Sequence, residues 1–283
     1  RADILDRNGQ LLATNLDTFS LYANPRLIRK PRLTAQNIVE ILPDLRVETV
    51  ERQLEEKRDF VWIKRRLTPE QKYAVNKLGY PGLDFKTEDR RFYPSGDLTS
   101  HVVGFTNIDN QGLSGFERKF DKALMESESP LSLSIDLRVQ HLMYQALRTS
   151  LKRFKARAAT GIILDANNGQ VISMVSLPGF NPNYLSSQNV TGLFNLATQG
   201  VYEMGSTFKI FTIAMALDSG EIKIQDEYDA SKPIRVGRFL IRDYRPKNRW
   251  LSIPEILLHS SNIGSAKIAL DIGRHRQRDF LKK

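Results

Sequence analysis

The chain has 283 residues, with 42 Lys and Arg against 32 Asp and Glu, no Cys, and 41% hydrophobic residues. This length supports a sizeable core and predicts about two domains. The ordinary charged and apolar content excludes a disordered chain. The absence of Cys excludes a disulfide framework, a zinc ribbon, an iron–sulfur site and a thiol nucleophile. No apolar run reaches the roughly 18 residues that a membrane-spanning helix needs.

The net charge of +10 is concentrated in the second half, because residues 131–283 carry 21 basic and 12 acidic residues. A basic half indicates an anionic partner, such as a carboxylate-bearing polymer, an anionic membrane surface or a nucleic acid. Zinc-finger spacing and an aromatic RNA-binding run are both missing, and the basic residues are scattered. We therefore expect no nucleic-acid partner.

Residues 1–130 alternate short apolar stretches with turns, which predicts a mixed and irregular module. Asn8-Gly9 is a strong turn signal between two apolar pairs. Apolar spacing and capping residues predict three helices. They are Thr34–Ile41 with Thr34 as N-cap, Val47–Lys57, and a segment from Pro69, capped by Thr68, to a stop at Gly79. Arg90–Gly96 and His101–Thr106 are predicted as strand and loop.

Ser, Glu and Pro cluster at Glu126–Pro130, which predicts a domain boundary there. A strand is expected at Leu131–Ile135, followed by a helix with apolar periodicity over Leu137–Phe154. Thr160–Asp165 and Gln170–Ser176 are β-rich runs joined by an Asn-Gly turn, which predicts a hairpin.

One pattern that could carry chemistry is Ser206-Thr207-Phe208-Lys209, an S-x-x-K sequence. Chance alone gives about one such match in this composition. Its context is more informative, because Gly205 precedes it and a helical segment follows, apolar nearly all round, ending near Gly220. Ser206 and Lys209 therefore share one face of the first turn of a helix that we expect to be buried.

That position predicts a reactive pair. The helix dipole and burial both disfavour a charge on Lys209, so its pKa is expected to fall toward that of a general base. A base beside the Ser206 hydroxyl is what a serine nucleophile requires. Free backbone N–H groups at the helix start are expected to stabilise a developing oxyanion.

A second polar element, Ser260-Ser261-Asn262, follows a predicted helix over Ile253–His259. Its simplest interpretation is a pair of caps between two helices. The alternative is that Ser260 and Asn262 join Ser206 and Lys209 in one site. A similar match at Ser187-Gln188-Asn189 lies in a polar loop and is interpreted as loop chemistry.

Taken together, the motifs resemble those of the class B penicillin-binding proteins, most closely the septal, cell-division type. The resemblance covers essentially the whole chain, and its specificity comes from the order and spacing of the motifs. They are RADILDRNG at Arg1–Gly9, R-x-Y-P-x-G at Arg91–Gly96, G-x-x-G-x-E at Gly112–Glu117, GQVISMVSLP at Gly169–Pro178, and YEMGSTFK at Tyr202–Lys209. Ile241–Tyr244 (IRDY) resembles the septal branch.

The resemblance implies an α+β fold with two parts. Residues 1–130 would be a non-catalytic pedestal or dimerisation module. Residues 131–283 would be the N-terminal part of a penicillin-binding transpeptidase domain, which is serine β-lactamase-like with an antiparallel sheet and helices. Two residues depart from the family pattern, Leu196 where Arg is usual and Met204 where Pro is usual.

The activity that the resemblance implies is D,D-transpeptidation of peptidoglycan. Ser206 would attack the penultimate D-Ala carbonyl of a stem peptide and Lys209 would accept its proton. Ser260 would pass a proton to or from the amines, and Asn262 would bind the substrate amide. No metal or organic cofactor is implied. The implied partners are stem peptides of lipid-linked or nascent glycan, β-lactams, and membrane proteins of the division machinery, including a glycosyltransferase.

The family's K-T-G motif is missing after Asn262. We therefore expect a fragment that lacks an N-terminal anchor upstream and sheet strands downstream. The whole protein is expected on the periplasmic face of the bacterial inner membrane. The fragment alone is expected to be unable to turn over substrate. Two alternatives stay open. One is a catalytically inactive scaffold of the division machinery, and the other is an S-x-x-K β-lactamase or β-lactam sensor, distinguished by the lifetime of its acyl-enzyme.

Overall fold

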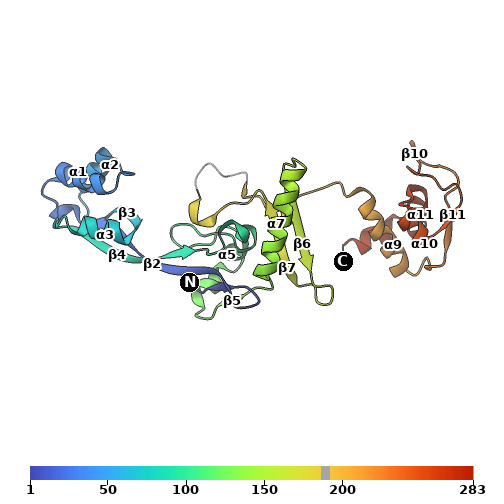
Figure 1. The fold of residues 1–283 in the computed structure, drawn as a ribbon, viewed down its shortest axis with the longest axis horizontal. Coiled ribbons are helices and arrows are strands. Elements are labelled where there is room, and N and C mark those ends of the chain that lie inside the picture. Colours follow the sequence, from blue (N-terminus) through green and yellow to red (C-terminus); the bar gives the residue numbers. More distant parts are fainter. Residues whose placement is uncertain (186–191, 283) are drawn as a thin grey trace. The chain divides into compact units, whose positions relative to one another are not determined.

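The computed structural model describes residues 1–185 and 192–282 (Figure 1). The chain forms two compact units, Arg1–Gly200 and Val201–Lys283. The Ser187–Asn189 match lies outside the described residues. The sequence boundary near residue 130 concerns domain organisation and stays a prediction. No helix among the described residues has both the length and the apolar character that crossing a membrane requires.

The first unit is built around one long strand. This strand, β2, pairs antiparallel with β1, β3 and β4, while β5 lies parallel to β1. The bounds of these strands are β1 Ile4–Leu5, β2 Leu11–Ala23, β3 Val61–Leu67, β4 Leu83–Phe92 and β5 Leu131–Ser132. The predicted turn at Asn8-Gly9 is confirmed, and Gly9 has the left-handed φ of 82° that this turn needs. β5 is shorter than the expected Leu131–Ile135.

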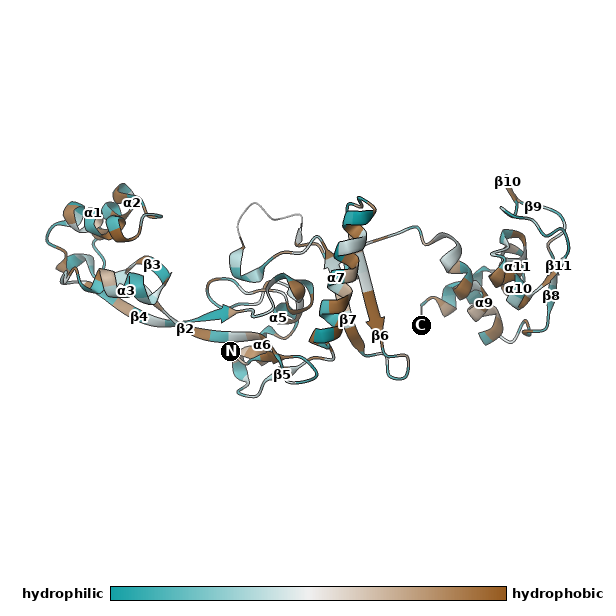
Figure 2. Ribbon diagram, in the orientation of Figure 1, coloured by the Kyte–Doolittle hydropathy of each residue, from teal (hydrophilic) through white to brown (hydrophobic). Residues whose placement is uncertain are grey.

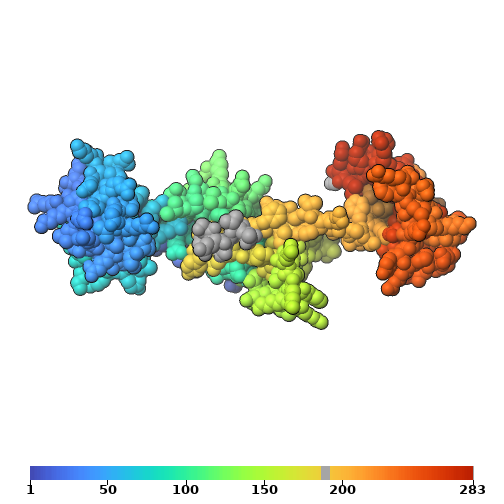
Figure 3. Space-filling model, turned by 90° about the horizontal axis from the view of Figure 1, so that it is seen from above, coloured from blue at the N-terminus to red at the C-terminus, as the bar shows by residue number. Residues whose placement is uncertain are grey.

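Three helices pack with β3 around one apolar core, which includes Leu21, Ile38, Leu42 and Leu54. Figure 3 shows this region, in blue, as one continuous body. The helices are α1 Pro31–Ile41, α2 Val47–Leu54 and α3 Pro69–Asn76, and a short 3₁₀ turn, η1 Pro25–Leu27, precedes them. The predicted start of α3 is confirmed, with Thr68 forming a capping box with Gln71.

The predicted start of α1 is wrong by three residues. The helix begins at Pro31, whose fixed φ suits the first helical position, so Thr34 lies inside the helix and is buried. α2 begins at the predicted residue but ends three residues early, at Leu54.

Short helices follow β4 and close a second core around Ile4, Leu12 and Leu133. They are η2 Gly96–Leu98, α4 Ser100–Val103, α5 Gly115–Lys119 and α6 Asp121–Glu126. The turn α4 occupies part of the segment His101–Thr106, where strand and loop were expected.

A buried ion cluster joins three of the motifs noted in the sequence. Glu117 Oε1 accepts from Arg91 Nε at 2.7 Å, and Glu117 Oε2 accepts from Arg1 Nε at 2.7 Å. The side chains of all three residues are at most 1% exposed. Arg1 also pairs with Asp121. Because a buried charge is stable only when paired, these contacts give the three motifs a structural reason to occur together.

The rest of the first unit is a helix packed on a hairpin. The predicted helix is confirmed as α7 Leu137–Arg153, and the predicted hairpin as β6 Ala159–Leu164 with β7 Val171–Leu177. Figure 2 shows apolar colouring along both strands. The buried Gln140 amide of α7 bonds Ser173, Met174 and Leu98. Two short segments follow, η3 Pro182–Tyr184 and α8 Leu196–Gln199.

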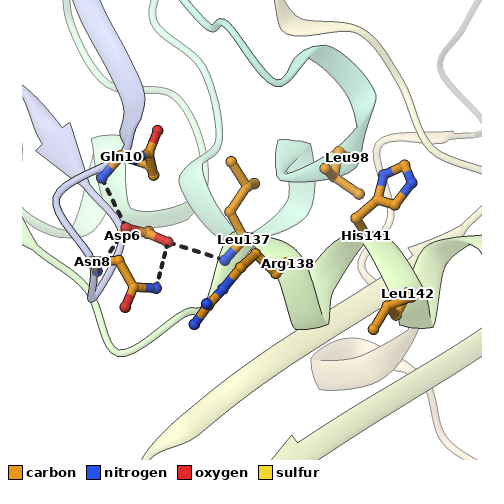
Figure 4. A pocket seen from close by; sticks show the side chains of 8 residues that line it. All are labelled: Asp6, Asn8, Gln10, Leu98, Leu137, Arg138, His141 and Leu142. Carbon is orange, nitrogen blue, oxygen red and sulfur yellow. Dashed lines mark hydrogen bonds between the residues drawn. The ribbon is translucent and has the colours of Figure 1, made fainter.

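A cleft of about 770 Å³ lies where the Asn8-Gly9 turn meets α7 (Figure 4). Its lining residues are Asp6, Asn8, Gln10, Leu98, Leu137, Arg138, His141 and Leu142. Burial raises the pKa of the Asp6 carboxyl, but the hydrogen bonds that it accepts from the backbone N–H groups of Asn8, Gln10 and Leu137 outweigh this and lower the pKa. This carboxylate therefore fastens the turn to the start of α7.

The second unit has a helical core flanked by short strands. Its elements are η5 Gly205–Phe208, α9 Lys209–Asp218, β8 Glu227–Asp229, β9 Ile234–Val236, β10 Phe239–Ile241, β11 Trp250–Ser252, α10 Ile253–Leu258 and α11 Asn262–Phe280. β8 pairs with β11 and β9 with β10, both antiparallel. Helical geometry is interrupted inside α11 at Gly273, which has a φ of 73°.

The expectation that the helix after Ser206 is buried nearly all round is wrong. Ile213, Met215 and Ala216 are buried in the core, but Phe208, Ile210 and Phe211 are each about half exposed. Only one face of α9 packs against other elements in the described chain, chiefly α11.

Candidate active site

The side-chain amine of Lys209 is the centre of the candidate site. Lys209 is the first residue of α9, and Ser206 lies one turn earlier in η5. Lys209 Nζ lies 3.3 Å from Ser206 Oγ, 3.0 Å from Ser260 Oγ, and 2.6 Å from Asn262 Oδ1. It also lies 2.6 Å from the backbone carbonyl of Ser260. The four candidate residues are therefore brought together, although they are up to 56 positions apart in the sequence.

Ser260 reaches the amine from a strained turn. Ser260 N–H bonds the carbonyl of Leu257, and Ser261 N–H bonds that of Ile256, which is the Schellman pattern that ends α10. This pattern places Ser260 in the left-handed position, with a φ of 53°, where glycine is usual. The strain is consistent with a need for the Ser260 hydroxyl at this place.

Asn262 starts the next helix, α11. Ser261 is the N-cap of α11, and its Oγ accepts from the N–H of Gly264 at 3.0 Å. The expected pair of helix caps is thus present for Ser261, while the side chains of Ser260 and Asn262 contact Lys209. The tripeptide therefore combines a helix cap with two side chains that reach Lys209.

The surrounding acceptors orient the Lys209 amine. The carbonyls of Ser260 and Asn262, both at 2.6 Å, can only accept hydrogen bonds. In its neutral form the amine has two N–H groups and one lone pair. When both N–H groups bond these carbonyls, the lone pair is left for a hydroxyl, and Ser206 Oγ lies within reach. The arrangement can therefore accept a proton from Ser206.

Burial lowers the pKa of Lys209, and the carboxylate of Asp243 opposes this effect. The direction is the one that the sequence predicts. The sequence predicts free backbone N–H groups at the start of this helix. The N–H of Thr207 is not free, because it donates to the carbonyl of Met204 at 3.2 Å within η5.

Sequence reasoning missed the structural parts played by Arg242 and Asp243. The carbonyl of Arg242 accepts from Asn262 Nδ2 at 2.8 Å, which turns the amide oxygen of Asn262 toward Lys209. The Asp243 carboxylate accepts from Ser261 Oγ at 2.8 Å and from the N–H of Ile263 at 2.9 Å. A carboxylate stabilises a helix N-terminus. However, Asp243 lies 18 residues before Ser261, and a contact over that distance leaves no periodic pattern in the sequence. The sequence showed these two residues only as part of the IRDY segment.

No metal centre accompanies this cluster in the part of the chain that the structure covers. Among residues 1–185 and 192–282, no group of three or more His, Cys, Asp or Glu side chains is placed to hold a metal ion. The chemistry that the geometry supports is that of a serine nucleophile with a lysine base.

Comparison with known proteins agrees with this chemistry. Residues 1–129 match the penicillin-binding protein dimerisation domain, and residues 159–283 match the penicillin-binding protein transpeptidase domain. The chain belongs to the penicillin-binding proteins. Both the recognition of the family and the α+β fold expected from the sequence are confirmed.

Curated relatives of this penicillin-binding protein carry transpeptidase names. The probable peptidoglycan D,D-transpeptidase FtsI of Caulobacter vibrioides is 36% identical over 98% of this chain and 47% of its own length. The probable peptidoglycan D,D-transpeptidase PenA of Neisseria gonorrhoeae is 31% identical, over 99% of this chain and 53% of its own length. The peptidoglycan D,D-transpeptidase FtsI of Escherichia coli is 29% identical, over 95% and 51%. The chain thus spans about half the length of these relatives.

A solved structure of a peptidoglycan synthetase from Bifidobacterium adolescentis has a similar fold. It matches with a TM-score of 0.71 at 19% identity, covering 100% of this penicillin-binding protein chain and 61% of its own. At this identity the likeness concerns the fold alone.

Proposed function

We propose that the protein carrying this chain is a peptidoglycan D,D-transpeptidase of septal cell-wall synthesis that is acylated by β-lactams. The observation that carries the proposal is the convergence of Ser206, Ser260 and Asn262 on the Lys209 amine. The printed names of the relatives, which are peptidoglycan D,D-transpeptidases, support the same reaction.

The reaction proceeds by nucleophilic catalysis. The Ser206 hydroxyl gives its proton to neutral Lys209 while Oγ forms an ester bond to the penultimate D-Ala carbonyl of a donor peptide. The bond to the terminal D-Ala breaks, and that residue leaves as an amine after taking a proton from Lys209 through Ser260. The amine of a neighbouring peptide then attacks the ester, loses a proton along the same route, and frees Ser206.

The remaining assignments rest on the family resemblance and on the sequence. Residues 1–130 serve as the pedestal or dimerisation module, and residues 131–283 supply the first part of the transpeptidase domain. The protein acts at the periplasmic face of the inner membrane, with division-machinery proteins including a glycosyltransferase as partners. The IRDY segment at Ile241–Tyr244 supports the septal type.

The test is intact-mass spectrometry of the full-length protein after incubation with benzylpenicillin. A stable adduct on the wild type, absent from Ser206→Ala, is expected. Ser219→Ala is the matched control, because Ser219 lies at the other end of α9, where its hydroxyl donates to the Ala216 carbonyl and accepts from the Glu221 N–H. Rapid loss of the adduct would indicate a β-lactamase, and no adduct on a folded wild type would indicate an inactive scaffold.

A further inference from the structure

The positive charge of the second unit is confined to one segment. Between Lys232 and Arg249 there are seven basic residues and one acidic residue. Elsewhere in residues 201–283 there are eight basic and nine acidic residues. The basic character of this unit therefore comes from residues 232–249, which we call the basic arm.

The basic arm is an exposed hairpin with an extended tail. β9 and β10 pair in register from Ile234↔Ile241 to Val236↔Phe239, and Gly237 takes the left-handed φ of 57° at the turn. In the described chain, six cations of the arm are exposed and make no ion pair. They are Lys232, Arg235, Arg238, Arg242, Arg245 and Lys247.

Exposed aromatic rings lie among these cations. Phe239 is 64% exposed and Tyr244 is 91% exposed. The guanidinium of Arg238 lies 5.1 Å from the centre of the Phe239 ring. Unpaired cations beside exposed aromatic rings form a surface that suits an anionic partner with apolar faces. These side chains do not serve an ion pair within the unit.

The arm is joined directly to the candidate site. The Arg242 carbonyl holds the Asn262 amide, and Asp243 holds Ser261. A polymer lying along the arm therefore passes beside the group that contacts Lys209. This connection favours a substrate strand over a membrane surface as the occupant, since a membrane would need no link to the reactive cluster.

We propose that the basic arm binds the carboxylates of an uncross-linked peptidoglycan strand, outside the peptide that reacts with Ser206. The inference rests on the proposed function. A strand presents many carboxylates in a row, so several weak contacts with exposed cations add up and raise the concentration of peptides near Ser206.

The test measures binding of the full-length protein to soluble uncross-linked peptidoglycan strands at low and physiological salt. The arm variant combines Arg235→Gln, Arg238→Gln and Arg245→Gln. The control variant combines Lys223→Gln, Arg274→Gln and Arg278→Gln, which remove the same charge from exposed positions outside the arm. Far-UV circular dichroism and the melting temperature show whether each variant is folded.

The arm variant is expected to bind the strands roughly five- to twentyfold more weakly at low salt, from three exposed contacts of modest strength. Its salt dependence should also be shallower than that of wild type, because fewer screened contacts remain. The control variant should bind as wild type does. Strands whose carboxylates have been amidated should bind wild type and the arm variant equally weakly.

Three results would overturn the inference. They are equal loss of binding in both variants, undiminished binding of amidated strands, and an arm-dependent affinity for vesicles containing anionic phosphatidylglycerol that exceeds the affinity for the strands. Acylation of Ser206 by benzylpenicillin, measured on wild type and the control variant, tests the proposed function separately. An acylated wild type without arm-dependent binding would reject the arm and leave the transpeptidase proposal standing.

Discussion

The side chain of Asn262 places its oxygen 2.6 Å from Lys209 Nζ. Its nitrogen donates to the Arg242 carbonyl at 2.8 Å, so the orientation of the amide is fixed from both ends. A side chain held in this way offers Lys209 an acceptor without a negative charge. This matters because a neutral acceptor leaves the lowered pKa of Lys209 in place.

Replacing Asn262 with Asp is therefore expected to slow acylation at neutral pH. The added carboxylate favours the charged form of Lys209 and raises its pKa, so the acylation rate should rise with pH only at higher pH than in wild type. The second-order rate constant for benzylpenicillin, measured across pH in the full-length protein, tests this. Asn262→Ala should slow acylation without moving the profile to higher pH; the same upward shift in both variants would contradict the charge argument.

Replacing Asp243 with Asn should move the pH profile the other way. The carboxylate of Asp243 raises the pKa of Lys209, so removing its charge lets burial lower that pKa further. Neutral Lys209 then exists at lower pH, and the rising limb of the acylation profile shifts to lower pH. Because Asn keeps only one acceptor for Ser261 Oγ and the Ile263 N–H, we also expect about 1 kcal/mol of lost stability.

The control for Asp243 is Asp279→Asn, which removes the same charge from an exposed position near the end of α11. It should leave both the pH profile and the melting temperature unchanged. A profile of Asp243→Asn that coincides with that of wild type would show that the charge has no influence on Lys209.

Ser260→Gly distinguishes the contribution of the Ser260 hydroxyl from that of the Ser260 backbone carbonyl. Glycine suits the left-handed φ of 53° and keeps the carbonyl that contacts Lys209, while the hydroxyl is lost. Relief of strain and the greater freedom of the unfolded chain nearly cancel, so stability should change by less than about 1 kcal/mol. Transfer to the acceptor amine should fall by about 10²- to 10⁴-fold, the range for losing a proton-transfer group.

Ser260→Ala is the matched variant, since it removes the same hydroxyl but keeps a Cβ in the left-handed conformation. It should lose the same activity and melt below Ser260→Gly. Full activity in the glycine variant would mean that the carbonyl of Ser260, rather than its hydroxyl, is what the reaction needs.

Glu117→Gln should destabilise the first unit severely. Glu117 is the carboxylate between the buried guanidinium groups of Arg1 and Arg91. Its neutralisation leaves Arg91 without its counter-charge and Arg1 with Asp121 alone, at a cost of about 3–5 kcal/mol. Urea unfolding followed by the fluorescence of Trp62, in a Trp250→Phe background, reports on this unit. The control Glu126→Gln, whose partner Lys122 is 87% exposed, should cost at most about 0.5 kcal/mol. Similar midpoints for the two variants would rule out a structural contribution of the buried charge.

Local signals in the sequence predicted the elements best where the conformation depends on neighbouring residues. The Asn8-Gly9 turn, the capping of α3 by Thr68, and the β6–β7 hairpin all follow from short-range rules. The predicted start of α1 was wrong because Thr34 resembles an N-cap. The helix begins earlier, at Pro31, and Thr34 is buried inside it.

Long-range contacts were beyond local rules. The sequence indicated Ser206 and Lys209 as a pair because they lie one turn apart. Ser260 and Asn262 were joined to that pair by the family resemblance and not by any local rule. Local rules also gave no means of seeing that Asp243 holds Ser261, since a single side-chain bond across 18 residues leaves no periodic pattern. The exposure of Phe208 and Phe211 was missed for a similar reason, because a helical pattern shows apolar faces without showing what covers them.

The pairing of Arg1 with Glu117 also bears on how the protein is made. The ladder between β2 and β4 can form once residue 92 has left the ribosome, but β1 finds its partner β5 only when residues 131 and 132 are available. At 5–20 residues per second, the first strand waits roughly 2 to 8 s beyond completion of that ladder. During this interval β1 can pair with β2 on one edge only, its other edge stays open, and Arg1 lacks its carboxylate partner until residue 117 has emerged. Nascent chains paused in this window are therefore the ones most in need of a chaperone.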